Sequence, residues 1–486
     1  MSALFTPHYL LALLWLLPAL LPLSQPRRWQ LAIGCAATGA LAAALLLPVA
    51  TTPAPLLFQL LIQLLAWVVL RFARRYLQGE PGQSRFLRAS GGLLAGATLV
   101  VASLDWLTLL LGWAITSRAL HQLLTYYPDR PQAVLAAQRE SLASRLAELL
   151  LLVAGGLMLL ATGSLLLSDA GMPLSETAQQ WLRIVAALLL VLAVVIKTAL
   201  LPFHGWLTQV MEAPTPVSAF LHAGVVNLAG IVLIKLAPLW QAVPAAAMLL
   251  TLWGGLTAAL ASWVMLTRIS IKLRLAWSTC AQMGFMVLEC GLGLYSLALL
   301  HLAAHSAYKA HAFLSSGNQV RSSIQRPATA KPTPPLRHLW HGVAGVLLLA
   351  ASIAAWQQFA THMPTPPRVL IVIIGLGLAP LCSSLRGGLA ALLLCQIYLL
   401  LHSLFAALQG DHAQAFALLQ WLLSAGFAAL YLLQGWLAWH PHHPLSHRLY
   451  ALAFGGLYLD EWWVGFTQRC RRALTLRQPA QGAAHD

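Results

Sequence analysis

Residues Ile196 to Pro238 read IKTALLPFHGWLTQVMEAPTPVSAFLHAGVVNLAGIVLIKLAP, an apolar stretch that prolines interrupt. It carries four ionisable side chains within or beside the apolar segments: Lys197, His204, His222 and Lys235. An ionisable residue at membrane depth is costly and marks a functional site by default. Helix breaks survive at that depth only where the freed backbone lies against protein or a wet cavity. The stretch therefore predicts a proton or ion path through a broken helix.

The composition around this stretch is that of a membrane protein. Of 486 residues, 59% are hydrophobic and 9% are charged, whereas soluble domains have about 25% charged residues. Apolar runs such as 10–23, 31–50 and 185–201 approach the length that spans a bilayer. The alternation of such runs with basic loops predicts an all-α polytopic membrane protein with about 13–15 transmembrane helices.

The net charge of +16 comes mostly from arginines in short loops between apolar runs. This is the positive-inside pattern, and it predicts an outside N-terminus, a cytoplasmic C-terminus and an outside acidic loop at 169–176. The transmembrane domain is expected over 1–468, with a polar cytoplasmic linker at 315–337 and a basic cytoplasmic tail at 469–486. No basic domain stands apart, so the expected partner is the lipid bilayer and not nucleic acid.

A second interrupted zone, Gly375–Gly388, reads GLGLAPLCSSLRGG. Breaks in two halves of a transporter favour inverted repeats around a midplane site. The first break is flanked by lysines and histidines, whereas only Arg386 accompanies the second.

Lysine is rare in the chain, with five lysines among 29 basic residues. Arginine keeps its proton in a protein, whereas a buried lysine can give it up. Lys197 and Lys309 lie in apolar surroundings, so we predict that both belong to a proton path. Lys235 is close to the predicted outer edge, and two interpretations stay open: a path residue, or a lysine that extends to the headgroups.

Lys309 belongs to a second cluster in HLAAHSAYKAHAF. His301, His305 and Lys309 are spaced i, i+4, i+8, so they share one helix face over about 12 Å. The spacing favours a proton relay. A zinc site is the alternative, but no carboxylate or cysteine accompanies the histidines in sequence. We therefore expect no metal or other cofactor in this chain.

Buried cations need counter-charges, and only 13 acidic residues exist. Glu148 follows Arg145 closely, so it either pairs there or acts on Lys197. Glu212 lies in the first break and is either a charge partner or exposed on a loop. Glu289 is the most buried acid by its sequence context.

Three segments resemble a known family. KTALLPFHGWLTQVMEAPTPVSAFLHAGVVNLAGIVLI, KLRLAWSTCAQMGFMVLECGLG and HLAAHSAYKAHAFLSSG match, in order and spacing, the antiporter-like proton-translocating subunits of respiratory complex I and of multi-subunit cation/proton antiporters. The resemblance covers about 105–316. It implies that Lys197 lies at a broken helix and that His222 lies on a central polar axis. His301, His305 and Lys309 would continue this axis.

The chain also departs from that family. The family usually has Gly-Trp-Glu where this chain has Gly112-Trp113-Ala114, so the glutamate that acts on the first lysine is missing. The lysine of the later broken helix is missing too, and His402 or Arg386 would have to replace it.

The segments LHQLLTYYPDRPQA at 120–133 and LYLDEWW at 457–463 are similar to DabB-type membrane subunits of two-component inorganic-carbon transport complexes. This resemblance implies a bacterial inner-membrane protein that conducts protons or Na⁺. Its partner would be a large peripheral cytoplasmic subunit, carbonic-anhydrase-like and zinc-containing. The partner would carry the enzyme chemistry, and ion flow would drive the hydration of CO₂ to bicarbonate. Two alternatives stay open: a proton-translocating subunit of an NADH dehydrogenase-like or antiporter complex, and a non-conducting membrane assembly subunit.

Overall fold

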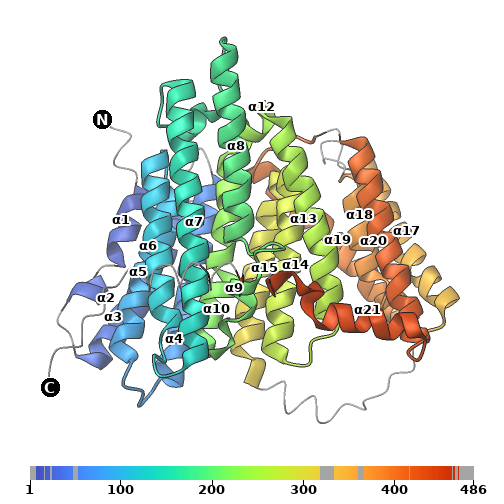
Figure 1. The fold of residues 1–486 in the computed structure, drawn as a ribbon, viewed down its shortest axis with the longest axis horizontal. Coiled ribbons are helices and arrows are strands. Elements are labelled where there is room, and N and C mark those ends of the chain that lie inside the picture. Colours follow the sequence, from blue (N-terminus) through green and yellow to red (C-terminus); the bar gives the residue numbers. More distant parts are fainter. Residues whose placement is uncertain are drawn as a thin grey trace.

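Long helices stand side by side through most of the molecule, and short helices connect them (Figure 1). Within the described residues the only β-type pairing is an isolated bridge between Asp105 and Leu166. The all-α fold class is therefore confirmed. The computed structural model describes residues 7–15, 17–21, 24–46, 53–317, 333–359, 366–414, 416–461, 464–465 and 469.

The helices before the second cluster of ionisable residues are α1 (Pro7–Leu14), α2 (Leu17–Leu20), α3 (Gln25–Leu46), α4 (Pro53–Tyr76), α5 (Gln83–Ala102), α6 (Trp106–Leu124), α7 (Pro131–Thr162), α8 (Thr177–Lys197), α9 (Gly205–Thr208), α10 (Thr215–Ala223), α11 (Leu228–Lys235), α12 (Ala237–Ala242) and α13 (Pro244–Met265). They are followed by α14 (Ile271–Gly291), α15 (Tyr295–Leu314), α17 (Pro335–Phe359), α18 (Arg368–Leu378), α19 (Leu385–Leu408), α20 (Ala417–Trp439) and α21 (Pro444–Phe454).

Ten segments of the described chain are long and apolar enough to cross a membrane, and α10 with α11 counts as one of them. This is fewer than the 13–15 that the sequence predicts. Three further helices of 19–21 residues, α6, α14 and α15, lie in the same bundle. They carry polar residues of the candidate path, so they are less apolar than the ten.

Two helix pairs cross closely where glycines lie between them. A Cβ added to Gly96 of α5 would lie 2.5 Å from Thr116 Oγ1 of α6. A Cβ on Gly254 of α13, or on Gly284 of α14, would lie 2.5 or 2.6 Å from a backbone nitrogen of the facing helix. Small residues let membrane helices approach until their backbones touch. These contacts fix the scaffold on which the buried polar residues are placed.

The first predicted break is present between α8 and α12. The chain leaves α8 at Lys197, turns, and continues through the short helices α9, α10 and α11. Ala199 has a φ of +54°, the left-handed region that residues with a Cβ seldom adopt. The Trp206 indole donates to Ile196 O at 2.9 Å, and the Trp253 indole donates to Leu201 O at 2.6 Å. Both bonds satisfy carbonyls that the break releases from helical pairing.

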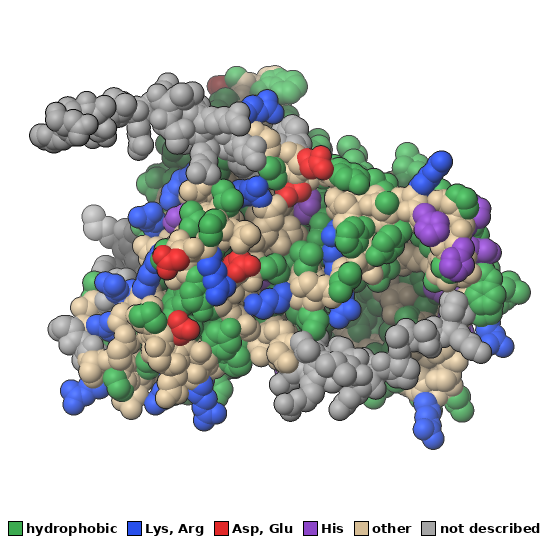
Figure 2. Space-filling view, turned by 60° about the horizontal axis from the view of Figure 1, so that its bottom comes forward, with side chains coloured by type: hydrophobic (Ala, Val, Ile, Leu, Met, Phe, Trp, Pro, Cys, Tyr) green, Lys and Arg blue, Asp and Glu red, His purple; other side chains and the backbone are tan. Residues whose placement is uncertain are grey.

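Basic side chains gather at one end of the bundle. Figure 2 shows Lys and Arg side chains across the face that is the bottom of Figure 1. The connection between α7 and α8, which contains Asp169 and Glu176, lies at the opposite end. This separation agrees with a positive-inside arrangement. Helix α21 lies across the basic end (Figure 1), where Arg268 donates to Phe454 O at 2.9 Å and to Ala453 O at 3.0 Å.

Most of the predicted linker and tail lies outside the described residues. Of the linker at 315–337 the structure describes 315–317 and 333–337, and of the tail at 469–486 it describes only Arg469.

Candidate functional site

The first buried cluster surrounds Lys197 at the C-terminal end of α8. The Lys197 side chain is 2% exposed, and its Nζ donates to Ser117 Oγ and Ser144 Oγ, both at 2.7 Å. Ser144 in turn donates to Glu140 Oε1 at 2.5 Å. Helix α7 places Glu140 and Ser144 four residues apart on one face, and α6 supplies Ser117. A buried ammonium is thus joined to a buried carboxylate through one hydroxyl.

Glu140 is the acid that sequence reasoning missed. It is 1% exposed, although a charged residue, Arg139, and a polar one, Ser141, flank it in the sequence. Its signal was the i, i+4 spacing to Ser144, which becomes informative once α7 is known to begin at Pro131. The absence of a glutamate at Ala114 on α6 therefore does not leave Lys197 without a nearby carboxylate.

The two predicted charge partners form other pairs. Glu148 accepts from Arg145 at 2.6 Å, on a side of α7 where Arg145 is 52% exposed. Glu212 accepts from Arg130 at 3.0 Å, and both side chains are largely exposed. Glu212 thus pairs with a surface arginine instead of a buried lysine, because the short helices after α8 carry it to the molecular surface.

His204 and Asp460 both lie at the break that follows α8. His204 is 1% exposed, its ring lies 4.6 Å from the ring of Trp277, and its Nδ1 has no hydrogen-bond partner in the described part. Asp460, from the segment after α21, accepts from Gln209 and lies directly against Gly205. Sequence reasoning did not find Asp460, because nothing local indicates that a C-terminal segment folds back onto the break.

The second buried cluster lies between α10, α14 and α15. Thr279 donates its only hydroxyl hydrogen to Leu275 O at 3.0 Å, so His222 Nδ1, 3.2 Å from that hydroxyl, is the donor. The opposite nitrogen of His222, Nε2, has no partner among the described residues. The His222 ring stacks on Phe313 at 4.3 Å. His222 therefore presents an acceptor nitrogen without a partner among the described residues, inside a buried site.

Lys309 lies beside this histidine and is fully buried. Its Nζ donates to Leu275 O at 2.9 Å and to Ser278 Oγ at 2.5 Å. No carboxylate of the described part pairs with Lys309. A cation in this position is held only by neutral acceptors, which makes loss of its proton less costly than in a salt bridge.

His305 and His301 continue along α15 in the predicted order. His305 is 4% exposed, and neither ring nitrogen has a partner in the described chain. The two histidine rings lie 6.2 Å apart, and His301 Nδ1 lies 2.9 Å from Glu289 Oε2 of α14. The stack Lys309, His305, His301 thus ends on a buried carboxylate. His305, whose ring nitrogens have no partner in the described chain, is thus free to accept or donate a proton within this stack.

Lys235 is held at the end of α11. Its Nζ donates to Ser103 O at 2.5 Å. Lys235 also lines a groove of about 700 Å³ that includes Gln409 and His412. The groove opens at the end of the bundle opposite the basic face, where the sequence placed the outer edge of the membrane.

His402 and Arg386, the two residues predicted for the second half of the path, differ in burial. His402 of α19 is 1% exposed, stacks on Tyr398 at 6.0 Å, and has no hydrogen-bond partner for either nitrogen within the described chain. Arg386, in contrast, is exposed at the first turn of α19. Arg386 is thus not a buried counterpart of the missing lysine, because α19 begins at the surface of the bundle, and its role in a path stays a prediction.

Among the described residues, no three His, Cys, Asp or Glu side chains come together in a way that could hold a metal ion. His301 and His305 lie one turn apart on α15, and Glu289 lies beside His301 only.

Residues 103–362 match the family model described as NADH:quinone oxidoreductase/Mrp antiporter, TM. The chain belongs to this family. The match contains every residue of both buried clusters. The family and the bundle make the chain a multi-pass membrane transport subunit and not an enzyme in its own right.

Relatives extend the similarity beyond the family segment. The chain is 37% identical over 413 residues to the probable inorganic carbon transporter subunit DabB of Hydrogenovibrio crunogenus, covering 83% of this chain and 79% of that protein. It is 38% identical over 428 residues to the probable inorganic carbon transporter subunit DabB2 of Halothiobacillus neapolitanus, covering 83% and 76%.

A solved structure of the Mrp complex from Dietzia sp. contains a chain with the same fold. The two superpose with a TM-score of 0.66 at 22% identity, over 98% of this chain and 60% of that one. The chain therefore spans less than two thirds of the Mrp chain that it resembles.

Proposed function

We propose that this chain conducts protons or Na⁺ through the membrane for an inorganic-carbon transport complex of the bacterial inner membrane. The observation that carries the proposal is the pair of buried lysines, Lys197 and Lys309, each held by neutral oxygen acceptors within a membrane-spanning bundle. A buried lysine without a directly bound carboxylate can give up its proton more readily than one in a salt bridge, whereas arginine would keep its proton.

Ion flow down the electrochemical gradient would supply the energy for transport. One charge that crosses 100 mV releases about 2.3 kcal/mol. We propose that this energy drives the hydration of CO₂ to bicarbonate by a peripheral cytoplasmic partner, zinc-containing and carbonic-anhydrase-like. One observation supports a DabB-type role over a respiratory one: the long matches to inorganic-carbon transporter subunits, which cover 83% of this chain.

Reconstitution of the purified complex into liposomes tests conduction. Lys197→Ala and Lys309→Ala should each abolish flux and leave assembly intact, because the buried proton carrier is gone. Lys197→Arg should also fail, because arginine keeps its proton. Lys272→Ala, at the first turn of α14, is the matched control and should retain flux. Normal flux in both alanine variants would refute the path.

Affinity purification from native membranes tests the assembly. A single large soluble partner that contains zinc is the expected result. Many small membrane subunits, or a quinone-reducing arm, would instead favour the respiratory or antiporter alternative. Absence of flux in the wild-type complex would favour the non-conducting assembly role.

A further inference from the structure

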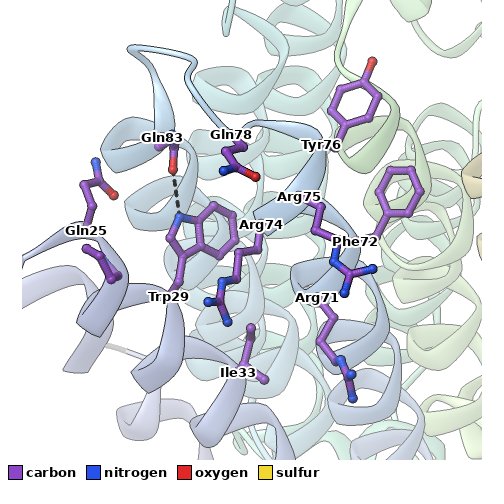
Figure 3. Close-up of a pocket in the computed structure, with 11 residues that line it drawn as sticks. Gln25, Trp29, Ile33, Arg71, Phe72, Arg74, Arg75, Tyr76, Gln78 and Gln83 are labelled. Atoms are coloured by element: carbon purple, nitrogen blue, oxygen red, sulfur yellow. Dashed lines mark hydrogen bonds between the residues drawn. The ribbon is translucent and has the colours of Figure 1, made fainter.

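A basic cavity of about 1210 Å³ lies between α3, α4 and the start of α5, away from both buried clusters (Figure 3). Three arginines of α4 line it, Arg71, Arg74 and Arg75. Their i, i+3, i+4 spacing places them on one side of the last two turns of the helix. The cavity therefore concentrates positive charge at the end of a membrane-spanning segment.

None of the described residues that line the cavity is Asp or Glu. None of the three arginines forms a salt bridge with a carboxylate of the described chain. Arg71 lies over the Trp67 ring, 4.7 Å from its centroid, which leaves its guanidinium hydrogens available. Because no carboxylate of the described residues pairs with them, these guanidinium groups are available to an oxyanion, which an arginine can bind with two parallel hydrogen bonds.

The opposite wall is rigid and offers further donors. Trp29 of α3 is 2% exposed, and its indole donates to Gln83 Oε1 at 3.0 Å (Figure 3). This bond uses the carbonyl oxygen of Gln83, so the amide hydrogens remain free to donate. In Figure 3, Arg74 extends toward Trp29, and Gln83 closes the far side of the same space. The bond between Trp29 and Gln83 thus joins α3 to α5 on this side of the cavity.

An apolar track leads from the cavity along α4. Val68 and Leu64, one and two turns before Arg71, are 41% and 46% exposed. On α3, Leu41 is 61% exposed. The arrangement places charge at the membrane surface and exposed hydrocarbon at membrane depth, as a phospholipid requires. The volume also exceeds the roughly 300–1,000 Å³ of a small-molecule pocket, more than a lone phosphate ion would fill.

We propose that this cavity binds the phosphate-bearing headgroup of an anionic phospholipid, with the acyl chains along the exposed faces of α3 and α4. The ligand chemistry is a phosphodiester, and its source is the bilayer. The lipid would fix α3 and α4 against α5 at the basic end of the bundle.

The full-length protein in detergent tests the proposal. Native mass spectrometry should detect retained anionic phospholipid, and added dioleoyl phosphatidylglycerol should raise Tm, whereas dioleoyl phosphatidylcholine should not. Each arginine near an anionic lipid contributes about fivefold to binding. The triple variant R71A/R74A/R75A should therefore weaken lipid binding about 100-fold.

A second triple variant, R337A/R386A/R448A, removes three exposed arginines at the same end of the bundle but outside the cavity. It should bind lipid like the wild type. If the cavity triple variant fails to fold, Arg74→Gln alone should still lower the apparent affinity about fivefold.

Three results would overturn the proposal. The first is equal loss of lipid in both triple variants. The second is stabilisation by inorganic phosphate alone without dependence on lipid, which would indicate a soluble anion. The third is loss of a soluble protein partner, with lipid retained, in the cavity variant, which would indicate an acidic protein surface as the ligand.

Discussion

Replacing Glu140 with glutamine should reduce ion flux through Lys197 far more than the same replacement at Glu148. In the structure, Glu140 reaches Lys197 through Ser144, with bonds of 2.5 and 2.7 Å, and all three side chains are buried. Glu148 instead accepts from Arg145, whose side chain is 52% exposed. Glutamine keeps the shape of glutamate and can still accept from Ser144, so the change isolates the charge.

The magnitude follows from the environments of the two acids. Bonds of 2.5 and 2.7 Å place a Glu140 oxygen within about 5 Å of Lys197 Nζ, where opposite charges attract by about 1.5–3 kcal/mol at an effective dielectric constant of about 20–40. Because each 1.4 kcal/mol is about tenfold in an equilibrium, loss of the Glu140 charge should lower the population of charged Lys197 by roughly ten- to hundredfold. The Glu148 side chain is 11% exposed, but its charge is already paired with Arg145, which is 52% exposed, and a pair with such an exposed partner contributes about 0–1 kcal/mol. Glu148→Gln should thus change the same population by less than about fivefold.

The assay is proton flux into liposomes under an imposed potential, with the reconstituted amount of each variant matched. Ser144→Ala is the companion variant, because it removes the bridging hydroxyl and leaves both charges in place. It should reduce flux in the same direction as Glu140→Gln. If Glu140→Gln keeps wild-type flux while Glu148→Gln abolishes it, Glu148 is the partner of Lys197, and the assignment of Glu140 is wrong.

Three other replacements test separate parts of the structure. Gly205→Ala places a Cβ where the Asp460 carboxylate lies; it should destabilise the docked C-terminal segment by about 1–3 kcal/mol, measured as faster proteolysis of that segment. Asp411→Ala removes two 2.7 Å bonds to Ser296 at the first turn of α15; it should lower the free energy of unfolding by about 1 kcal/mol, with Glu80→Ala as a surface control. Asp460→Asn should remove a pH dependence from the docking of the C-terminal segment, which protease accessibility across pH would detect.

The sequence predicted the burial of the path residues well, because burial depends on local context. Lys197, His222 and Lys309 have apolar neighbours, and the structure leaves each of them between 0 and 2% exposed. The order along α15 was predictable for a related reason, since helical spacing alone places His301, His305 and Lys309 on one face.

The partners of those residues were not predictable in the same way. Ser117 and Ser144 come from helices 80 and 53 residues away from Lys197 in sequence, and no periodicity indicates which faces meet. The exposure of Arg386 was not predictable from the sequence either. The glycine-rich break near it was visible in sequence, but whether the side chain points inward depends on the packing of α19 against its neighbours.

The pH dependence of Asp460 can be derived from its surroundings. Asp460 lies outside the ten candidate membrane spans, and burial raises its pKa, although the charge of Arg139 and the hydrogen bond from Gln209 act in the opposite direction. A carboxyl group with a raised pKa in the docked state is bound best as the neutral acid. Docking should therefore be strongest below the ordinary aspartate pKa of about 3.9 and should weaken as pH rises through the raised value.

The asparagine variant keeps a neutral side chain at every pH, so its C-terminal segment should stay docked where the wild-type segment opens. Glu461→Gln is the matched control, because Glu461 is the exposed neighbour of Asp460 and should leave the wild-type pH profile unchanged. Hydrogen exchange of the segment between about pH 4 and 8 measures the profile directly. Parallel profiles for wild type and Asp460→Asn would mean that the carboxylate stays charged when docked, and that Arg139, not burial, sets its protonation.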